Sequence, residues 1–227
     1  MERELHDHYF RQAKRDGYLS RAAYKLLEIN ERKSLLKSEN RVLDCGCAPG
    51  SWVQVAIKKV GNQGTVVGID LCSIEHVFHE KNVHLIQGDF RDIPCEQLLG
   101  YLQRGKFDVI LSDMAPHTTG ARPTDHHASE RLCHDVLDRC NELLAENGNL
   151  VMKVFEGEAY AQLLGRTRTL FNKAKGFVPK ASRSQSTEIY IVCHGFIVKD
   201  SAEIDSSILS PKSDALPRRK PSRGWKK

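Results

Sequence analysis

The sequence has no apolar run long enough to cross a membrane and no recognisable targeting leader. A membrane-spanning helix needs about 20 consecutive apolar residues, and no segment of the 227 residues approaches that length. Residues 1–4 include two acids, and no apolar signal region follows them. A transit peptide avoids acids and a secretory signal needs an apolar stretch. We therefore expect a cytoplasmic protein with no membrane contact.

Paired cysteines and clustered metal ligands are also lacking. The seven cysteines are an odd number at irregular spacings, and several lie within apolar patterns, as buried thiols do in a reducing compartment. Cys45 and Cys47 form a C-x-C pair, but no second cluster accompanies it. His126, His127 and His134 are consistent with a polar helix surface. We expect no metal site.

Charge is concentrated at the two ends of the chain. The net charge is +5. Residues 1–41 carry ten Lys/Arg against seven Asp/Glu, and residues 200–227 carry seven against four, so each end contributes +3. Residues 42–199 carry 17 against 18. A near-neutral body with cationic ends suits a nucleic-acid binder, and a solvated surface explains the same charge equally well.

These shifts in composition divide the chain into three parts. Residues 1–40 are predicted to be a helical lead, broken near Asp16-Gly17, in which basic side chains alternate with tyrosines; such residues either bind RNA or pack the lead onto the main domain. Residues 41–199 form the predicted catalytic domain. Residues 200–227 are rich in Ser, Pro, Lys and Arg, which predicts a disordered basic tail.

The central part alternates strand-like and helical patterns. This alternation predicts an α/β fold, a Rossmann-like doubly wound and mostly parallel sheet of seven strands with helices on both faces and an antiparallel last strand. We expect helices at Ser51–Val60, Cys95–Gln103, Thr124–Glu146 and Glu158–Lys173. The strand patterns lie near Val42–Asp44, Thr65–Ile69, Val83–Gln87, Phe107–Leu111, Asn149–Val154 and Ile189–Cys193.

A glycine loop joins the first of these strands to the first helix of the domain. Gly46 and Gly50 allow a positive φ and close backbone approach to a ligand, and Pro49 fixes one dihedral between them. Their Gly-x-x-x-Gly spacing differs from the Gly-x-Gly-x-x-Gly of dinucleotide folds, and no P-loop lysine follows. The loop alone is compatible with an ordinary turn, so its interpretation depends on what the next strands carry.

Acidic residues end the next two strands. Asp70 follows Gly50 by 20 residues, where a carboxylate can accept hydrogen bonds from both ribose hydroxyls. Asp89 ends the third strand, where an adenine amino group would lie. Ligands of doubly wound sheets bind at the carboxyl ends of the strands. The sequence therefore predicts an adenosine site, and S-adenosylmethionine fits it better than NAD or ATP because the ligand need not carry phosphates.

Two charged side chains mark the later strands. Asp113 follows the fourth strand, and Lys153 lies inside the otherwise apolar run of the fifth. Burying an isolated ammonium costs several kcal/mol, so Lys153 is expected to be paired or functional unless it extends from a strand edge to solvent. Glu188 precedes the last strand, and by itself is consistent with a surface glutamate.

Six motifs together resemble those of the FtsJ/RlmE family of ribosomal RNA 2′-O-ribose methyltransferases. They cover roughly residues 8–196 and read S-R-A-A-Y-K-L, D-C-G-C-A-P-G-S-W-V-Q, G-D-F-R-D, S-D-M-A-P, V-M-K-V-F and S-T-E-I-Y. The resemblance implies a catalytic tetrad of Lys25, Asp113, Lys153 and Glu188. It also implies cofactor contacts from Gly50, Trp52, Asp70, Asp89 and Asp113. Cys45, Cys47 and Ser51 depart from the family's usual Leu, Ala and Gly, and the basic tail is extra.

The resemblance also implies a reaction. Lys153 is the expected base for the ribose 2′-hydroxyl, although an ordinary lysine pKa of about 10.4 leaves it protonated. Burial and the neighbouring charge of Lys25 favour its neutral form, while Asp113 opposes that shift. We expect Lys25 and Lys153 to converge on Asp113, with Lys25 and Glu188 positioning the ribose.

The expected substrate is a ribose of large-subunit ribosomal RNA, following the family. The implied nucleotide is the A-loop uridine, and the implied partner is the assembled large ribosomal subunit late in its maturation. We expect a monomer. The alternatives are 2′-O-methylation of tRNA or an mRNA cap, which the same tetrad serves, and a non-catalytic RNA-binding assembly factor. A dinucleotide-dependent oxidoreductase is disfavoured by the glycine spacing.

Overall fold

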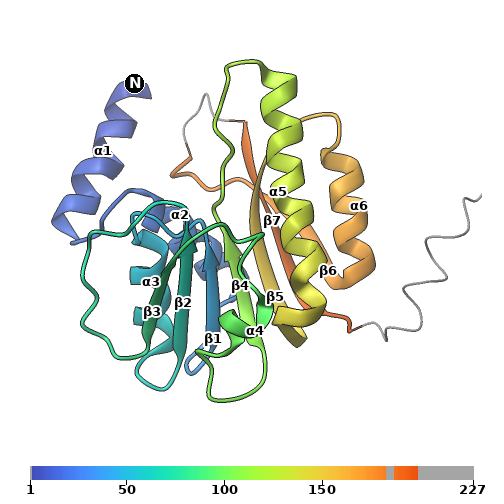
Figure 1. Ribbon diagram of the computed structural model, residues 1–227. Helices are drawn as coiled ribbons and strands as arrows, with labels where there is room; N and C mark the ends of the chain where they lie inside the picture. The colour runs from blue at the N-terminus through green and yellow to red at the C-terminus, as the bar shows by residue number, and fades with distance from the viewer. Residues whose placement is uncertain (1, 183–186, 199–227) are drawn as a thin grey trace, which may run out of the picture.

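A seven-stranded sheet covered by helices on both faces forms the body of the protein (Figure 1). The computed structural model describes residues 2–182 and 187–198. The helices are α1 (Glu2–Arg15), α2 (Ala22–Lys33), α3 (Ser51–Val60), α4 (Cys95–Leu99), α5 (Arg122–Leu143) and α6 (Tyr160–Leu170). The strands are β1 (Arg41–Cys45), β2 (Thr65–Asp70), β3 (Val83–Gln87), β4 (Phe107–Ser112), β5 (Leu144–Phe155), β6 (Phe171–Phe177) and β7 (Glu188–Phe196).

The strand order is β3-β2-β1-β4-β5-β7-β6. Strands β1 to β5 pair in parallel, and β7 runs antiparallel to both of its neighbours, β5 and β6. This arrangement confirms the predicted doubly wound sheet and its antiparallel last strand. It brings the carboxyl ends of β1, β2, β4 and β5 to one edge of the sheet, and β7 begins at that edge because its direction is reversed.

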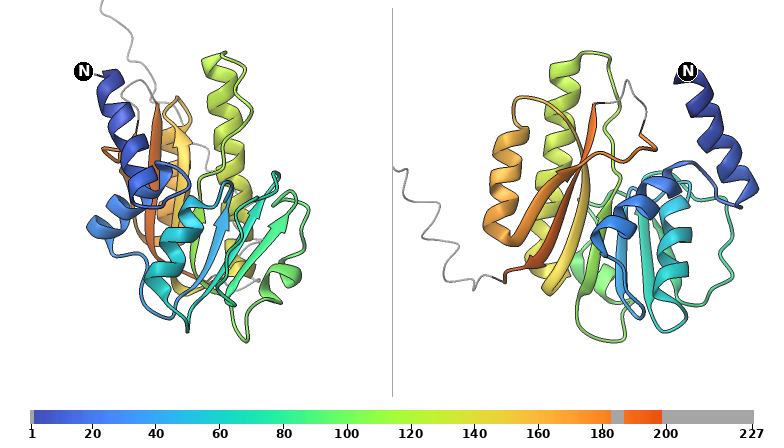
Figure 2. Two further views of the ribbon diagram at one scale, coloured as in Figure 1. Left: turned by 90° about the vertical axis from the view of Figure 1, so that its left-hand side faces the viewer. Right: turned by 180° about the vertical axis from the view of Figure 1, so that it is seen from behind.

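Alternate residues of the central strands supply two cores. Val42, Val66 and Val109 belong to the core beneath α2 and α3, where Val151 and Tyr190 join them. Their chain neighbours, which include Leu43, Val67, Ile110 and Met152, belong to the core beneath α4, α5 and α6. Successive strand residues point to opposite faces, so a strand buried on both faces reads as one continuous apolar run. Figure 2 shows the two helical layers from the side and from behind.

The structure corrects the predicted boundaries near the chain's last third. The helix predicted to reach Lys173 ends at Leu170, and Phe171–Phe177 is strand β6. This strand lies at the sheet edge and exposes Lys173 and Lys175, so its sequence lacks an apolar run. The segment forms a strand because it pairs with β7 and buries Phe171 and Ala174.

Two other boundaries also differ from those predicted. Helix α4 ends at Leu99 instead of Gln103, with Gly100 at its C-cap. Helix α5 ends at Leu143 instead of Glu146, and β5 begins at Leu144, before the predicted Asn149. Leu144 pairs with Phe107 of β4. Tertiary pairing therefore extends a strand into residues whose local pattern continues a helix.

The lead preceding the sheet is divided between two environments. Helix α2 is packed into the core through Ala23, Leu26 and Ile29, which are fully buried. Helix α1 stands away from the sheet (Figure 1), and Tyr9 contacts the ring of Tyr24 with centroids 5.6 Å apart. No helix in the described part of the chain is both long and apolar enough to cross a bilayer. The predicted tail, residues 200–227, lies outside the described residues.

Candidate active site

Lys153 and Asp113 form an ion pair at the edge where the parallel strands end. The Lys153 ammonium lies 2.9 Å from Asp113 Oδ1 and also donates a 2.6 Å hydrogen bond to the Asp113 main-chain carbonyl. Lys153 is 8% exposed, so its charge is almost removed from water. Lys153 is thus paired, which is one of the outcomes expected for a lysine inside an apolar strand.

Lys25 and Glu188 form a second buried ion pair. Lys25 Nζ lies 2.6 Å from Glu188 Oε1, and both residues are less than a tenth exposed. The expectation that both lysines meet on Asp113 is therefore wrong for Lys25. One lysine pairs with each carboxylate, which satisfies two buried charges of each sign.

Tyr190 joins the two pairs. Its hydroxyl donates a 2.8 Å hydrogen bond to Asp113 Oδ1, and the Lys25 ammonium lies 5.7 Å from the centroid of its ring. The pKa of Tyr190 is raised well above the usual 10, mainly by burial and further by the nearby charges of Asp113 and Glu188. Tyr190 therefore stays neutral and remains a donor at neutral pH.

Strand register brings these groups together. Lys153 is directly opposite Tyr190, and Phe155 is opposite Glu188, in the antiparallel β5–β7 ladder. Lys153 and Tyr190, paired in the ladder, project on the same side of the sheet, here toward α2, whereas the Phe155 ring lies near His126 of α5. Sequence reasoning did not select Tyr190, because a tyrosine in an apolar strand is an ordinary core residue until its cross-strand partner is known.

Trp52 supports this arrangement from α3. Its indole Nε1 donates a 2.8 Å hydrogen bond to the Ala22 carbonyl, which fixes the start of α2 against α3. Its ring lies 5.8 Å from that of Tyr190, and the residue is 3% exposed. Trp52, predicted to contact the cofactor, is therefore buried between the start of α2 and Tyr190.

The glycine loop approaches the segment after β4 closely. Gly46 has φ 76°, and a Cβ there would lie 2.8 Å from the Met114 backbone nitrogen. Gly50 has φ 110° and precedes α3 as its N-cap without a side-chain capping bond. Pro49 lies between them after a cis peptide bond. The first N–H groups of α3 have no intrahelical partner, so this turn suits a polar ligand.

Asp70 lies beside the glycine loop, as predicted. Its carboxylate accepts hydrogen bonds from the backbone N–H of Ala48, at 2.9 Å, and of Cys72, at 2.8 Å. Each carboxylate oxygen can accept more than one hydrogen bond. Asp70 can therefore hold the loop and still offer acceptors to a pair of hydroxyls.

Asp89 has a partner that sequence reasoning did not identify. Arg91 Nη2 lies 2.5 Å from Asp89 Oδ2, and Arg91 Nε lies 2.9 Å from Oδ1. Hydrogen bonding from the Arg91 side chain is the main reason that the pKa of Asp89 falls to about 2. Asp89 is therefore charged and held in place, so an adenine amino group would share it with Arg91.

Asp44, near the end of β1, is a further residue that sequence reasoning missed. It is fully buried, and both carboxylate oxygens lack a hydrogen-bond partner among the described residues. Burial is the largest cause that raises its pKa well above the usual range, and the charges of Asp113 and Asp70 add to it. An acid without partners beneath the glycine loop indicates that the site accommodates a further polar group.

The chain's described part offers no metal centre, since no group of three His, Cys, Asp or Glu side chains is placed to hold an ion. The polar groups instead suit a nucleoside with a small charged extension. Glycine backbone, Asp70 and Asp89 lie on one side of Asp113, and the two buried lysines lie on the other. The arrangement can bind a donor and acceptor next to each other and receive a proton.

Comparison with known proteins points to one family. Residues 18–196 match the model of the FtsJ-like methyltransferases. The chain is 45% identical over 188 residues to the ribosomal RNA large subunit methyltransferase E of Syntrophobacter fumaroxidans, covering 83% of this chain and 94% of that protein. It is 42% identical over 197 residues to the protein of that name from Methanothermobacter thermautotrophicus, covering 87% and 93%.

Solved structures give the same result at the level of the fold. A Plasmodium falciparum protein described as a ribosomal RNA methyltransferase superposes with a TM-score of 0.71 and 30% identity, covering 80% of this chain and all of that one. Fibrillarin from Aeropyrum pernix, solved with natively bound S-adenosyl-L-methionine, superposes with a TM-score of 0.54 and 18% identity over 75% of each chain. At that identity the second likeness concerns the fold alone.

Proposed function

The chain belongs to the FtsJ-like methyltransferase family, and from this premise we propose that it methylates a ribose 2′-hydroxyl of large-subunit ribosomal RNA, with S-adenosylmethionine as donor. The observation that carries the proposal is the buried set of Lys153, Asp113, Tyr190, Lys25 and Glu188 beside the glycine loop. These two ion pairs support Lys153 as a candidate base at the strand ends that carry the proposed nucleoside site.

The residues around the loop fit this cofactor. Gly46 and Gly50 would let the loop backbone approach its amino-acid part closely, with Pro49 fixing the turn between them. Asp70 would accept from the ribose hydroxyls, and Asp89 would accept from the adenine amino group. Asp44 offers unpartnered oxygens beneath the loop, and Asp113 and Trp52 border the reacting side. The bound cofactor would supply an electrophilic methyl on a sulfonium.

Lys153 is the proposed base. The Lys153 ammonium must first release one proton to solvent; the amine then keeps two N–H donors, enough for its two contacts with Asp113, and gains a lone pair. The lone pair is then free to take the 2′-hydroxyl proton. Methyl transfer would join the ribose oxygen to the methyl carbon as the carbon–sulfur bond breaks. Lys25 and Glu188 would hold the ribose, and alignment of donor and acceptor would supply much of the acceleration.

The substrate assignment follows the relatives named ribosomal RNA large subunit methyltransferase E. We assign the basic lead, residues 1–40, and the tail, residues 200–227, to RNA binding, and residues 41–199 to catalysis. The A-loop uridine and the assembled subunit are proposed as nucleotide and substrate, on the family resemblance. Action late in subunit maturation, a monomeric state and a cytoplasmic location are further proposals.

One experiment tests the reaction and its substrate together. Purified full-length protein is incubated with methyl-labelled S-adenosylmethionine and either isolated large subunits, free ribosomal RNA or tRNA. We expect label in large-subunit RNA, as a 2′-O-methyl group on one uridine identified by mapping. Label confined to tRNA would show that tRNA, and not large-subunit RNA, is the substrate. No transfer to any RNA would reject the proposed function.

A further inference from the structure

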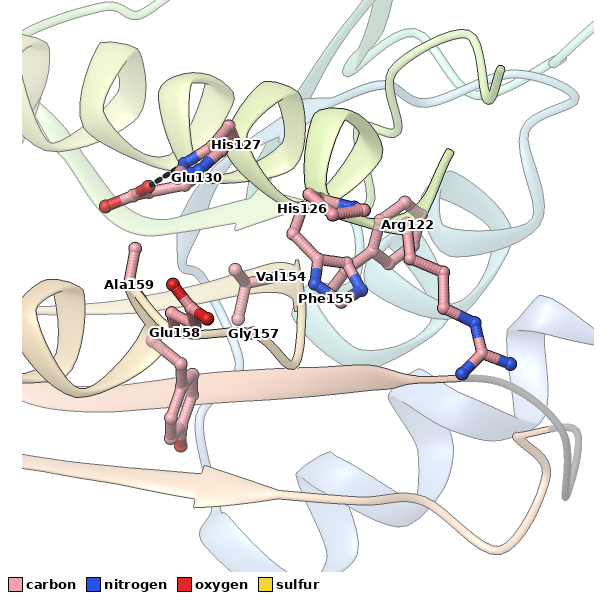
Figure 3. A pocket seen from close by; sticks show the side chains of 11 residues that line it. Arg122, His126, His127, Glu130, Val154, Phe155, Gly157, Glu158 and Ala159 are labelled. Carbon is pink, nitrogen blue, oxygen red and sulfur yellow. Dashed lines mark ion pairs between the residues drawn. The ribbon is translucent and has the colours of Figure 1, made fainter. Parts of the chain in front are cut away.

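A cavity outside the paired-lysine site lies between the start of α5 and the turn that joins β5 to α6 (Figure 3). Its volume is about 310 Å³, within the range of roughly 300–1,000 Å³ found for small-molecule sites. The cofactor and proton-transfer residues described above do not line it. It therefore needs a separate explanation.

One wall of the cavity is aromatic. The rings of His126 and Phe155 lie with centroids 6.5 Å apart at an interplanar angle of 61°. A Cβ on Gly157 would lie 2.5 Å from His126 Nδ1 and 3.0 Å from its Cβ. The missing side chain at Gly157 therefore allows the imidazole to lie against the turn. The wall offers two π-faces of the kind on which unpaired bases stack.

Two charged side chains of opposite sign also line the cavity. Arg122 and Glu158 are both exposed, and neither has an ion-pair partner within the described ranges 2–182 and 187–198. In Figure 3, Arg122 lies on the side of His126 and Phe155, and Glu158 lies toward Glu130. Glu130 already interacts with His127, at 3.5 Å. The cavity thus has a free cation near its aromatic wall and a free acceptor away from that wall.

The cavity and the proposed reaction centre share the carboxyl end of β5. Phe155 is two residues beyond Lys153, about 7 Å along the strand at about 3.3 Å per residue, and it is the cross-strand partner of Glu188. Its backbone N–H donates a 3.1 Å hydrogen bond to Ser129 Oγ of α5. The same strand therefore fixes both the aromatic wall and the lysine base.

Building on the proposed function, we propose that this cavity binds the base of an unpaired nucleotide that flanks the acceptor in the substrate RNA. The base stacks on the His126 ring and meets Phe155 at its edge, Arg122 pairs with its phosphate, and Glu158 accepts a hydrogen bond from an exocyclic amino group. Such an amino group is present in adenine, cytosine and guanine but not in uracil. Recognition of unpaired bases by stacking and edge contacts is the usual route to sequence preference in RNA binding.

Binding of short RNA tests the subsite without relying on catalysis. Full-length wild-type protein is titrated into fluorescently labelled single-stranded hexanucleotides of adenine, cytosine or uracil. We expect tighter binding of the adenine and cytosine oligomers than of the uracil oligomer. His126→Ala should weaken binding on the order of tenfold because the stacking ring is lost. Gly157→Ala should weaken binding similarly because its Cβ would displace the imidazole. Arg131→Ala, an exposed arginine further along α5, is the control.

Steady-state methyl transfer to large subunits gives a second readout. His126→Ala and Arg122→Ala should raise the KM for RNA and leave kcat and cofactor affinity near the wild-type values, with an unchanged melting temperature as evidence of folding. The subsite is rejected if these variants match Arg131→Ala in both assays, or if wild-type protein binds all three oligomers equally. Absence of methyl transfer by the wild type would instead reject the proposed function. The oligomer titration would still test the subsite in that case, because it measures binding and needs no catalysis.

Discussion

Lys153 and Tyr190 face each other across the β5–β7 ladder, and both contact the same carboxylate oxygen, Asp113 Oδ1. The ammonium lies 2.9 Å from that oxygen and the hydroxyl 2.8 Å. Asp113 is therefore held from two directions by side chains of two antiparallel strands. Because Tyr190 also contacts Lys25 through its ring, it connects the two ion pairs of the site.

Replacing Lys153 should abolish methyl transfer while leaving cofactor binding in place. Lys153→Ala removes the proposed base, and the loss of a general base typically lowers kcat by roughly 10²- to 10⁴-fold. Label transfer measures the activity, and calorimetry measures cofactor affinity. Lys59→Ala, an exposed lysine on α3, controls for the loss of a positive charge. Full turnover by Lys153→Ala would exclude it as the base.

Removing only the Tyr190 hydroxyl should weaken catalysis without removing the ring. Tyr190→Phe keeps the packing against Trp52 and the contact with Lys25, but Asp113 loses one donor. We expect kcat to fall about tenfold, which corresponds to about 1.4 kcal/mol, just below the roughly 1.5–3 kcal/mol of a hydrogen bond to a charged group. Tyr101→Phe, on a half-exposed tyrosine outside the site, should have no effect. Equal kcat values for both variants would assign Tyr190 to packing alone.

Asp70→Ala should weaken cofactor binding for two reasons. The variant loses the proposed acceptor for the ribose hydroxyls, and it releases the backbone N–H groups of Ala48 and Cys72. Calorimetry should show a rise in Kd of at least tenfold, while Asp92→Ala, on an exposed aspartate, should leave Kd unchanged. An unaltered Kd in Asp70→Ala would remove the ribose assignment.

The stability of the cofactor-free protein should depend on pH through Asp44. Because the pKa of this buried acid is higher in the folded state than in the unfolded chain, its contribution is fully present below the unfolded pKa of about 3.9. The contribution is lost as pH rises through the folded pKa. Between the unfolded-state and folded-state pKa of Asp44, wild type loses stability as pH rises, whereas Asp44→Asn does not. The unfolding free energy of Asp44→Asn relative to wild type should therefore increase with pH across that range. Denaturant titrations of both proteins check this, and parallel pH profiles would show that Asp44 has an ordinary pKa.

Deleting residues 200–227 should weaken RNA binding and reduce its dependence on salt. This segment carries seven Lys/Arg, and each phosphate that it neutralises contributes about 0.7 to the slope of log affinity against log salt for single strands. Affinities measured at several salt concentrations give that slope. A variant whose tail lysines and arginines are replaced by glutamine serves as the length-matched control. The same slope with and without the tail would show that it does not contact RNA.

Much of the fold could be predicted because its central strands are buried on both faces and its helices are amphipathic. Those patterns involve residues close together in the chain, so they can be recognised without knowing which strands pair. Strand β6 was missed because an edge strand exposes Lys173 and Lys175 and has no continuous apolar run. The shortened α4 and the early start of β5 at Leu144 were likewise decided by capping and pairing.

The sequence by itself determined the doubly wound sheet, the family and the polar residues at the strand ends, since motif order and spacing are properties of the chain. Only the tertiary structure decided how those residues pair. Lys25 meets Glu188 and Lys153 meets Asp113, with Tyr190 between them, because β7 runs antiparallel beside β5 and α2 packs over both. The hydrogen-bond register of non-adjacent strands sets these partners, and no local pattern in the chain records it.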